Sequence, residues 1–203
     1  MEVKLMLDEQ YDKLMYAAAN HKYVSLAINE DGSPVRQGSV PWERTCNAFN
    51  MRTPNITIAV RDLKEPKIID ALKRAHFLGC YIFVPMEKEM YTYLAQFNEL
   101  ADVHIKNGRN VDNLSFLENM TDLFMFYLEG ASLKNLEQLV SVMGKNRKTP
   151  GKCIAFKNCD IKDVSCLANI EFIISELLIW PSDGDYKERW KLPYRPGTFK
   201  FYR

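Results

Sequence analysis

The residues that could do chemistry in this chain are few and widely spaced. Its three histidines, His21, His76 and His104, form neither a His-Glu-x-x-His motif nor an ordered Cys, His and Asp set. Cys80 lies four residues after His76, but it opens a strand-like apolar stretch and does not continue a helix. A nucleophilic thiol needs a base held beside it. The sequence therefore predicts a protein without enzymatic activity.

Metal and phosphate sites are not predicted either. The five cysteines are an odd number without Cys-x-x-Cys spacing, which argues against structural zinc and favours buried reduced thiols. The glycines of Asp31–Ser39 lack the Lys-Ser/Thr of a phosphate loop, and Pro181–Tyr186 lacks the spacing of a calcium loop. We expect no metal and no cofactor.

Charge and hydropathy exclude two further classes of function. Lys and Arg total 27 and Asp and Glu total 26, so the chain lacks the basic excess of a nucleic-acid-binding protein. The basic run Lys145–Lys152 has no aromatic stacking platform, and we interpret it as a solvated loop. No apolar run reaches membrane-spanning length and no signal peptide is recognisable, so we expect a cytoplasmic protein without membrane contact.

Two stretches, Val111–Leu123 and Ile161–Ile173, share one pattern of apolar residues at every third position. The apolar positions are Val111, Leu114, Leu117 and Met120 in the first, and Ile161, Val164, Leu167 and Ile170 in the second. A short alternating stretch precedes each one, at 103–105 and 154–156. We call such a row of apolar residues at every third position an apolar comb. A strand followed by an apolar comb is typical of one coil of a solenoid.

Further strands fit the same scheme. They are predicted at Ile56–Val60, Tyr81–Val84, Val103–Ile105, Phe124–Leu128, Ile154–Phe156 and Leu177–Trp180. The residues Phe83, Ile105, Phe126, Phe156 and Trp180, taken as equivalent, follow one another at steps of 22, 21, 30 and 24. The long third step contains the segment around Gly144–Gly151, where we expect an inserted loop. The pattern predicts that these strands lie parallel and adjacent.

The remaining predicted elements are of two kinds. Some are the segments that connect one strand to the next, which we call returns, and the others cover the two ends of the predicted solenoid as caps. Helices are predicted at Asp8–Asn20, Glu65–Phe77, Lys88–Leu100 and Ser132–Gly144. A strand at Tyr23–Asn29, a turn at Glu30–Ser33 and a second strand near Val35–Val40 suggest a hairpin. We therefore expect an N-terminal α+β cap over residues 1–54, a solenoid over 55–180 and a C-terminal capping tail over 181–203.

The strand and comb together resemble the leucine-rich repeat, in particular the short bacterial repeat of 22 residues found in internalin-like proteins. The resemblance is most specific in Lys152–Ile173, where Asn158 or Cys159 takes the place of the repeat's turn Asn or Cys, and in Asp102–Leu123, where Asn107 does so. In the coil between them Gly130 and Ala131 replace that Asn. The resemblance implies an α/β solenoid with a parallel strand face that binds a protein or peptide.

The register assumed for these strands predicts which residues point outward. The expected partner-binding residues are Ile82, Val84, His104, Lys106, Met125, Tyr127, Lys157 and Ile179. This stripe is apolar for a solvent face, which favours a contact surface. We expect a non-enzymatic interaction protein, with an immunity or inhibitor protein and an adaptor as open alternatives. A homodimer through the stripe, or a ligand-binding or enzymatic pocket between the N-terminal segment and the first coils, are the competing hypotheses.

Overall fold

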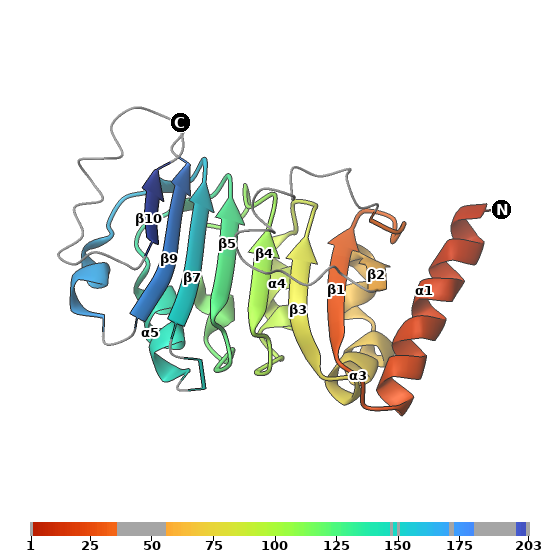
Figure 1. The fold of residues 1–203 in the computed structure, drawn as a ribbon. Coiled ribbons are helices and arrows are strands. Elements are labelled where there is room, and N and C mark those ends of the chain that lie inside the picture. Colours follow the sequence, from red (N-terminus) through yellow and green to blue (C-terminus); the bar gives the residue numbers. More distant parts are fainter. Residues whose placement is uncertain are drawn as a thin grey trace. The chain divides into compact units, whose positions relative to one another are not determined.

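Parallel strands and helical returns alternate along the chain in this computed structural model (Figure 1). The structure describes residues 2–35, 56–146, 148–149, 151–170, 173–180 and 198–201. The chain divides into two compact units, Met1–Val84 (unit 1) and Pro85–Arg203 (unit 2). The predicted boundaries after residues 54 and 180 lie beside segments outside the described residues, so that division stays a prediction.

Unit 1 is an α/β unit whose three described strands are parallel. Its elements are α1 (Glu2–Ala19), β1 (Val24–Asn29), β2 (Ile56–Ala59), the 3₁₀ helix η1 (Val60–Lys64), α3 (Pro66–Arg74) and β3 (Phe77–Ile82). Strand β1 lies between β2 and β3. Pro66 begins α3, where a missing N–H costs nothing. Helix α1 packs against α3 and β2 and buries Leu14, Ala17 and Ala18.

The N-terminal predictions are met in part. The turn after β1 forms as expected, since the backbone N–H of Gly32 donates to Asn29 Oδ1 over 2.6 Å and that of Ser33 donates to Asp31 Oδ1 over 2.9 Å. The predicted hairpin strand near Val35–Val40 lies outside the described residues except for Val35. Both described neighbours of β1 are parallel to it.

Unit 2 is also an α/β unit with parallel strands. Its sheet runs in the order β10-β9-β7-β5-β4, and β6 pairs with β8 beside it. The strands are β4 (Asp102–Ile105), β5 (Met125–Glu129), β6 (Ser132–Leu133), β7 (Gly151–Lys157), β8 (Asp160–Ile161), β9 (Ile173–Trp180) and β10 (Thr198–Phe201). The returns are α4 (Lys88–Leu94), η2 (Ser115–Leu117), α5 (Glu137–Lys145) and η3 (Ser165–Asn169).

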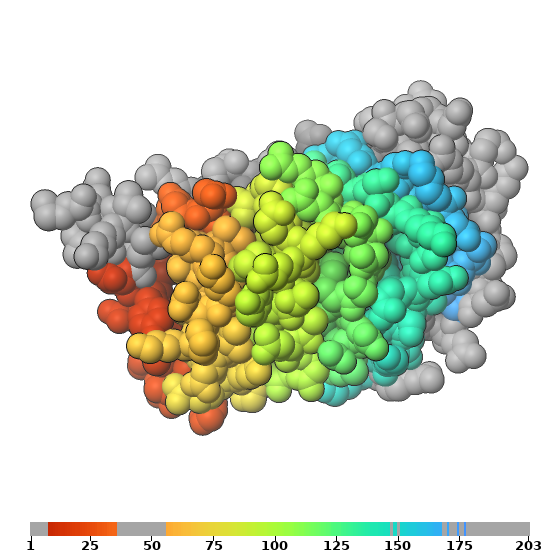
Figure 2. All heavy atoms as spheres, turned by 180° about the vertical axis from the view of Figure 1, so that it is seen from behind, coloured from red at the N-terminus to blue at the C-terminus, as the bar shows by residue number. Residues whose placement is uncertain are grey.

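The returns of unit 2 stack in chain order behind its strands. Helix α4 contacts η2, η2 contacts α5, and α5 contacts η3. Figure 2, seen from the opposite side to Figure 1, shows this face as successive bands from yellow-green through green to blue-green. The adjacency and parallel direction predicted for the strands containing Ile105, Phe126 and Phe156 are confirmed.

Both faces of the central strands of unit 2 are buried. On the face toward the returns, the fully or almost fully buried side chains are Val103, Ile105, Phe126, Leu128, Ile154, Phe156 and Leu177. The comb residues Val111, Leu114, Leu117, Met120, Ile161 and Leu167 are also buried, as the pattern predicts, whereas Val164 and Ile170 are partly exposed. On the opposite face His104, Met125, Tyr127 and Ala155 are buried too. Parallel strands covered on both faces lose the alternation of polar and apolar residues.

One turn recurs at the start of three returns in unit 2. The backbone N–H of Ser115 donates to Asn113 Oδ1 over 3.1 Å, that of Glu137 to Asn135 Oδ1 over 3.3 Å, and that of Ser165 to Asp163 Oδ1 over 2.8 Å. Such a local bond replaces the first turn of a helix. The residue between the partners has almost one conformation, with φ and ψ of −114° and 23° at Leu114, −115° and 13° at Leu136, and −119° and 9° at Val164.

Three asparagine side chains of unit 2 bond backbone of an earlier segment at one constant sequence distance. Asn110 Nδ2 donates to Met86 O over 3.2 Å, Asn119 Nδ2 to Ala95 O over 3.2 Å, and Asn146 Nδ2 to Asp122 O over 2.8 Å. Each pair is 24 residues apart. Loop carbonyls that would otherwise lack partners are satisfied in this way.

Two predicted helices are shorter than expected. The helix predicted at Ser132–Gly144 begins only at Glu137, because Ser132 and Leu133 pair with Asp160 and Ile161 as strands β6 and β8. The helix predicted at Lys88–Leu100 ends at Leu94. In the first case a pairing between distant segments overrides a local helical pattern.

Candidate functional site

A set of polar side chains in unit 2 lies on the strand face opposite the one that contacts the returns. This polar face consists of Asp102 and His104 on β4, Lys106 just beyond it, Tyr127 and Glu129 on β5, and Lys157 on β7. His104 pairs with Tyr127 and Glu129 with Lys157 in the ladder, so these side chains project on one side. Residues two apart on three neighbouring parallel strands therefore form one continuous set.

Close contacts link the members of the polar face. His104 Nε2 lies 2.5 Å from Asp102 Oδ1, and the His104 ring stacks on Tyr127 with centroids 5.6 Å apart and planes 8° apart. Tyr127 donates its hydroxyl to Glu129 Oε2 over 2.7 Å. Glu129 Oε1 lies 2.7 Å from Lys157 Nζ. Lys106 Nζ lies 3.8 Å above the Tyr127 ring, within cation–π range.

Burial sets the protonation state of Tyr127. Its side chain is 3% exposed, and loss of water together with the hydrogen bond to Glu129 raises the pKa of Tyr127 well above its usual range. The phenol therefore stays neutral and acts as a donor. The Glu129 and Lys157 side chains remain 23% and 35% exposed, so they form the accessible end of the polar face.

The predicted outward stripe is largely buried. Ile82, His104, Met125 and Tyr127 are at most 6% exposed, so the solvent exposure expected for them is wrong. Val84, Lys106 and Lys157 are partly exposed. The polar face contains two of these partly exposed residues, Lys106 and Lys157. Partner binding by these residues stays a prediction.

The register assumed at both ends of the stripe is wrong. Ile179 pairs with Phe156 in the ladder between β7 and β9, and not with Lys157, with which the predicted register groups it. In unit 1 Ile82 pairs with Ile28, and Ile28 pairs with Ile58, whereas Thr57, expected on the same side as Ile82, projects on the other. Strands with apolar residues on both faces carry no alternation from which the register could be fixed.

The inward turn position expected from the repeat is occupied by small residues. The Cys159 Sγ is buried and lies 3.3 Å from Leu128 O on β5, so the thiol contacts the backbone of the neighbouring strand. Burial raises the pKa of Cys159 to about 11, which keeps it a thiol. Asn158 instead takes a left-handed conformation at φ 51°. Of the two alternatives, Cys159 is the inward residue.

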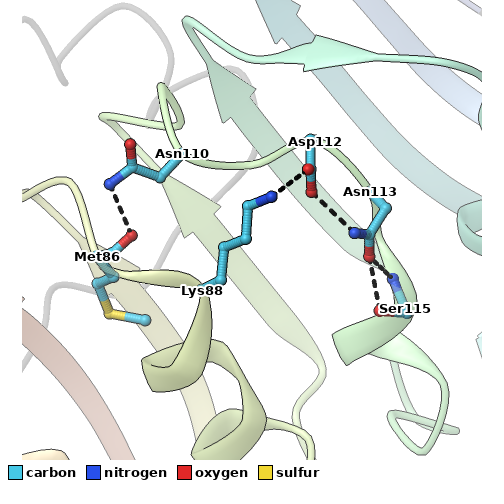
Figure 3. A network of polar contacts seen from close by, with 6 residues as sticks. All are labelled: Met86, Lys88, Asn110, Asp112, Asn113 and Ser115. Atoms are coloured by element: carbon cyan, nitrogen blue, oxygen red, sulfur yellow. Dashed lines mark hydrogen bonds and ion pairs between the residues drawn. The ribbon is translucent and has the colours of Figure 1, made fainter.

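A second polar network lies at the surface between α4 and the turn before η2 (Figure 3). Lys88 Nζ pairs with Asp112, whose other oxygen accepts from Asn113 Nδ2 over 2.8 Å. Asn113 Oδ1 in turn accepts from Ser115 Oγ over 2.6 Å. The hydrogen bond from Lys88 lowers the pKa of Asp112. The adjoining open depression holds about 310 Å³, but its polar groups join successive turns of the chain to each other.

The polar face combines two lysines, two carboxylates, a histidine and a tyrosine. Among the described residues, no three metal-ligating side chains come together. Cys159, one of the four described cysteines that are free thiols, lies at the end of this face, with its Sγ 3.4 Å from Lys157 O. Lys106, Glu129 and Lys157 are partly exposed and present alternating charges around the buried Tyr127 ring.

Sequence reasoning missed Asp102, and its register placed Glu129 on the outward side without including it among the partner-binding residues. Each lies two residues from an expected residue on the same strand, so the period of two in a strand could have found both. In the described part of the chain, none of the helices has the length and apolarity needed to cross a bilayer. No protein-family model, no curated protein and no solved structure matches this chain.

Proposed function

We propose that this chain is a leucine-rich-repeat-like solenoid without enzymatic activity, and that it binds a protein partner through the polar face of unit 2. Three features support the repeat. The same Asx turn opens three returns, asparagine bonds recur at 24 residues, and Cys159 reaches the preceding coil. Stacked coils that cannot bury their combs alone produce this set of contacts.

The observation that carries the function is the linked row Lys106, Tyr127, Glu129 and Lys157. These residues come from three adjacent strands and place opposite charges on either side of a buried tyrosine. Interfaces are enriched in tyrosine, and charged groups around such a ring fix orientation more than affinity. A partner surface with an acidic group facing Lys106 and a basic group facing Glu129 fits this row.

A pull-down with charge variants tests the proposal. The full chain is immobilised and exposed to extract of its host, and a stoichiometric protein partner is expected. Glu129→Lys should abolish capture of that partner, because it places three like charges in the row. The control Lys162→Glu changes charge as much at an exposed pair with Asp160 and should capture normally. Equal capture by both variants, or a small molecule in place of a protein, would refute the proposal.

The competing hypotheses keep their own tests. Homodimerisation through the strand face predicts a dimer by light scattering that Tyr127→Glu or Val84→Glu dissociates. A pocket formed with the N-terminal segment would need polar residues such as Arg36, Arg44 and Arg52, which lie outside the described residues. The cytoplasmic location and the roles of immunity protein, inhibitor or adaptor stay predictions.

A further inference from the structure

Two histidines in unit 1 occupy backbone positions that normally belong to glycine. His21 follows α1 with φ 49° and His76 follows α3 with φ 54°. At His21 the chain forms a Schellman motif, since the backbone N–H of Lys22 donates to Ala17 O over 2.9 Å and that of His21 to Ala18 O over 3.3 Å. A left-handed conformation is costly for a residue with a Cβ atom. The backbone conformation of the two turns would favour glycine and therefore does not explain why histidine occupies both positions.

The two turns bring aromatic rings together. The rings of His21 and His76 have centroids 6.2 Å apart, and the His76 and Tyr23 rings 5.7 Å apart. His21 Nδ1 lies 3.2 Å from Arg74 O, and the backbone N–H of Val24 donates to His76 O over 3.1 Å. Segments more than fifty residues apart in the chain thus share one surface.

This surface is exposed although it is aromatic. Tyr16 is 59% and Tyr23 64% exposed, and they are the exposed large apolar residues of the described chain. Lys22 Nζ lies 4.6 Å above the Tyr16 ring and donates to its hydroxyl over 3.3 Å. Exposed tyrosines with adjacent cations are typical of interface hot spots. We call Tyr16, His21, Lys22, Tyr23, Arg74 and His76 the His–Tyr patch.

We propose that the His–Tyr patch docks an acidic segment of a partner protein. The segments Tyr16–Tyr23 and Asp70–Phe77 hold Lys22, Lys73 and Arg74 against the single carboxylate Asp70, which pairs with Arg74 Nε over 3.4 Å and leaves an excess of two positive charges among the Lys, Arg, Asp and Glu residues. Lys73 and Arg74 lie in the last turn of α3, where positive charge is also favourable for the helix dipole. Their presence is therefore explained without a partner, and we assign the specificity for the acidic segment to the aromatic residues. Carboxylates meet the cations and the ring N–H groups, and the tyrosines pack against the partner's side-chain stems.

Charge favours a protein over a nucleic acid as the occupant. Non-specific binding of nucleic acid neutralises several phosphates and needs a longer basic track than two excess charges provide. The proposal does not depend on the polar face of unit 2, because none of its residues belongs to that face.

The test uses the full chain with two fluorescent probes at equal salt, poly-L-glutamate and an oligo-dT strand. We expect binding to polyglutamate that Tyr16→Ala/Tyr23→Ala weakens about tenfold. The variant His21→Gly/His76→Gly should also weaken it, yet melt at an equal or higher temperature than wild type, which a structural role for the histidines would not allow. Asn158→Gly relieves the same backbone strain in unit 2 and should leave binding unchanged.

Three results would overturn the proposal. The first is absence of polyglutamate binding by the wild type. The second is unchanged binding by both patch variants, and the third is tighter binding to oligo-dT than to polyglutamate, which would make the patch a nucleic-acid surface.

Discussion

The substitution Gly108→Ala tests how closely successive strands of unit 2 approach each other. A Cβ atom at Gly108 would lie 2.7 Å from Leu128 Cδ1 and 2.9 Å from the backbone oxygen of Glu129. The Gly108 N–H donates to that same oxygen over 2.7 Å. The added methyl must therefore displace a side chain and the backbone of the next strand, and it strains the hydrogen bond that holds them together.

The expected sign is destabilising despite the usual benefit of alanine. At an ordinary backbone conformation Gly→Ala stabilises a protein by about 0.4–1 kcal/mol through the unfolded state. Overpacking a buried site costs about 1–3 kcal/mol. Because one of the two contacts is with backbone, which cannot rotate away, we expect the steric cost to prevail. The free energy of unfolding should fall by about 1–2 kcal/mol.

A double-mutant cycle separates this steric effect from any other cause. Leu128 is fully buried, so Leu128→Ala alone should cost about 2–5 kcal/mol, but it also removes the atom nearest to the new methyl group. The pair Gly108→Ala/Leu128→Ala should therefore cost less than the sum of the single variants by about 1 kcal/mol. Urea unfolding at equal slope measures all four free energies.

Gly130→Ala provides the matched control. A Cβ atom there meets nothing within 4 Å, but Gly130 has φ +74°, so the variant is strained only through its backbone. Its cost should add to that of Leu128→Ala without coupling. Additive behaviour in both cycles, or a Gly108→Ala variant as stable as wild type, would refute the close approach of the strands.

Three further predictions rest on single residues. Leu117→Asp and Leu167→Asp should each lower the melting temperature strongly, because both leucines are at most 1% exposed and a carboxylate there lacks a partner; unchanged melting of both would contradict the comb assignment. Lys152 is fully buried, and burial lowers the pKa of its amine below the usual 10.5. Between the lowered pKa and 10.5 the unfolded chain binds more protons than the folded one, so the stability of wild type relative to Lys152→Met should increase as the pH rises. Urea midpoints at neutral and alkaline pH measure this difference. Cys159, with a pKa of about 11, should resist alkylation at pH 8 until urea is added, while half-exposed Cys153 reacts first; mass mapping of the peptides decides.

Residue spacing predicted the strands and combs of unit 2 because both depend on local periodicity. Leu114, Leu117, Val164 and Leu167 occupy the same places in recurring returns, and a period of three is visible without knowledge of the partners. The long step of 30 residues between Phe126 and Phe156 correctly indicated extra chain between two neighbouring strands. Strands β5 and β7 pair with each other, and helix α5 and a loop connect them in the sequence.

Register and long-range contacts could not be predicted in the same way. Leu177 and Ile179 are as apolar as Leu178, so no sequence signal says which side of β9 faces the returns. The short pair β6 and β8 joins segments 28 residues apart in the chain, and Ser132 by itself favours no strand. The contact between His21 and Arg74 joins positions 53 residues apart, which left the His–Tyr patch invisible in the sequence.

The charged pair of the polar face, Glu129 and Lys157, is expected to add little to the free energy of unfolding. Polar groups on a covered strand face are costly unless paired, and a partly exposed ion pair such as Glu129–Lys157 contributes only about 0–1 kcal/mol. Removing both charges while keeping an acceptor for the buried Tyr127 hydroxyl, as in Glu129→Gln/Lys157→Met, should therefore leave the free energy of unfolding nearly unchanged. If the row recognises a partner, the same variant should lose that partner, whereas Lys162→Met, at an exposed pair, should keep it. A stable variant that still captures the partner would show that the row is a structural pair, and a destabilised one would show that the fold itself requires the charges.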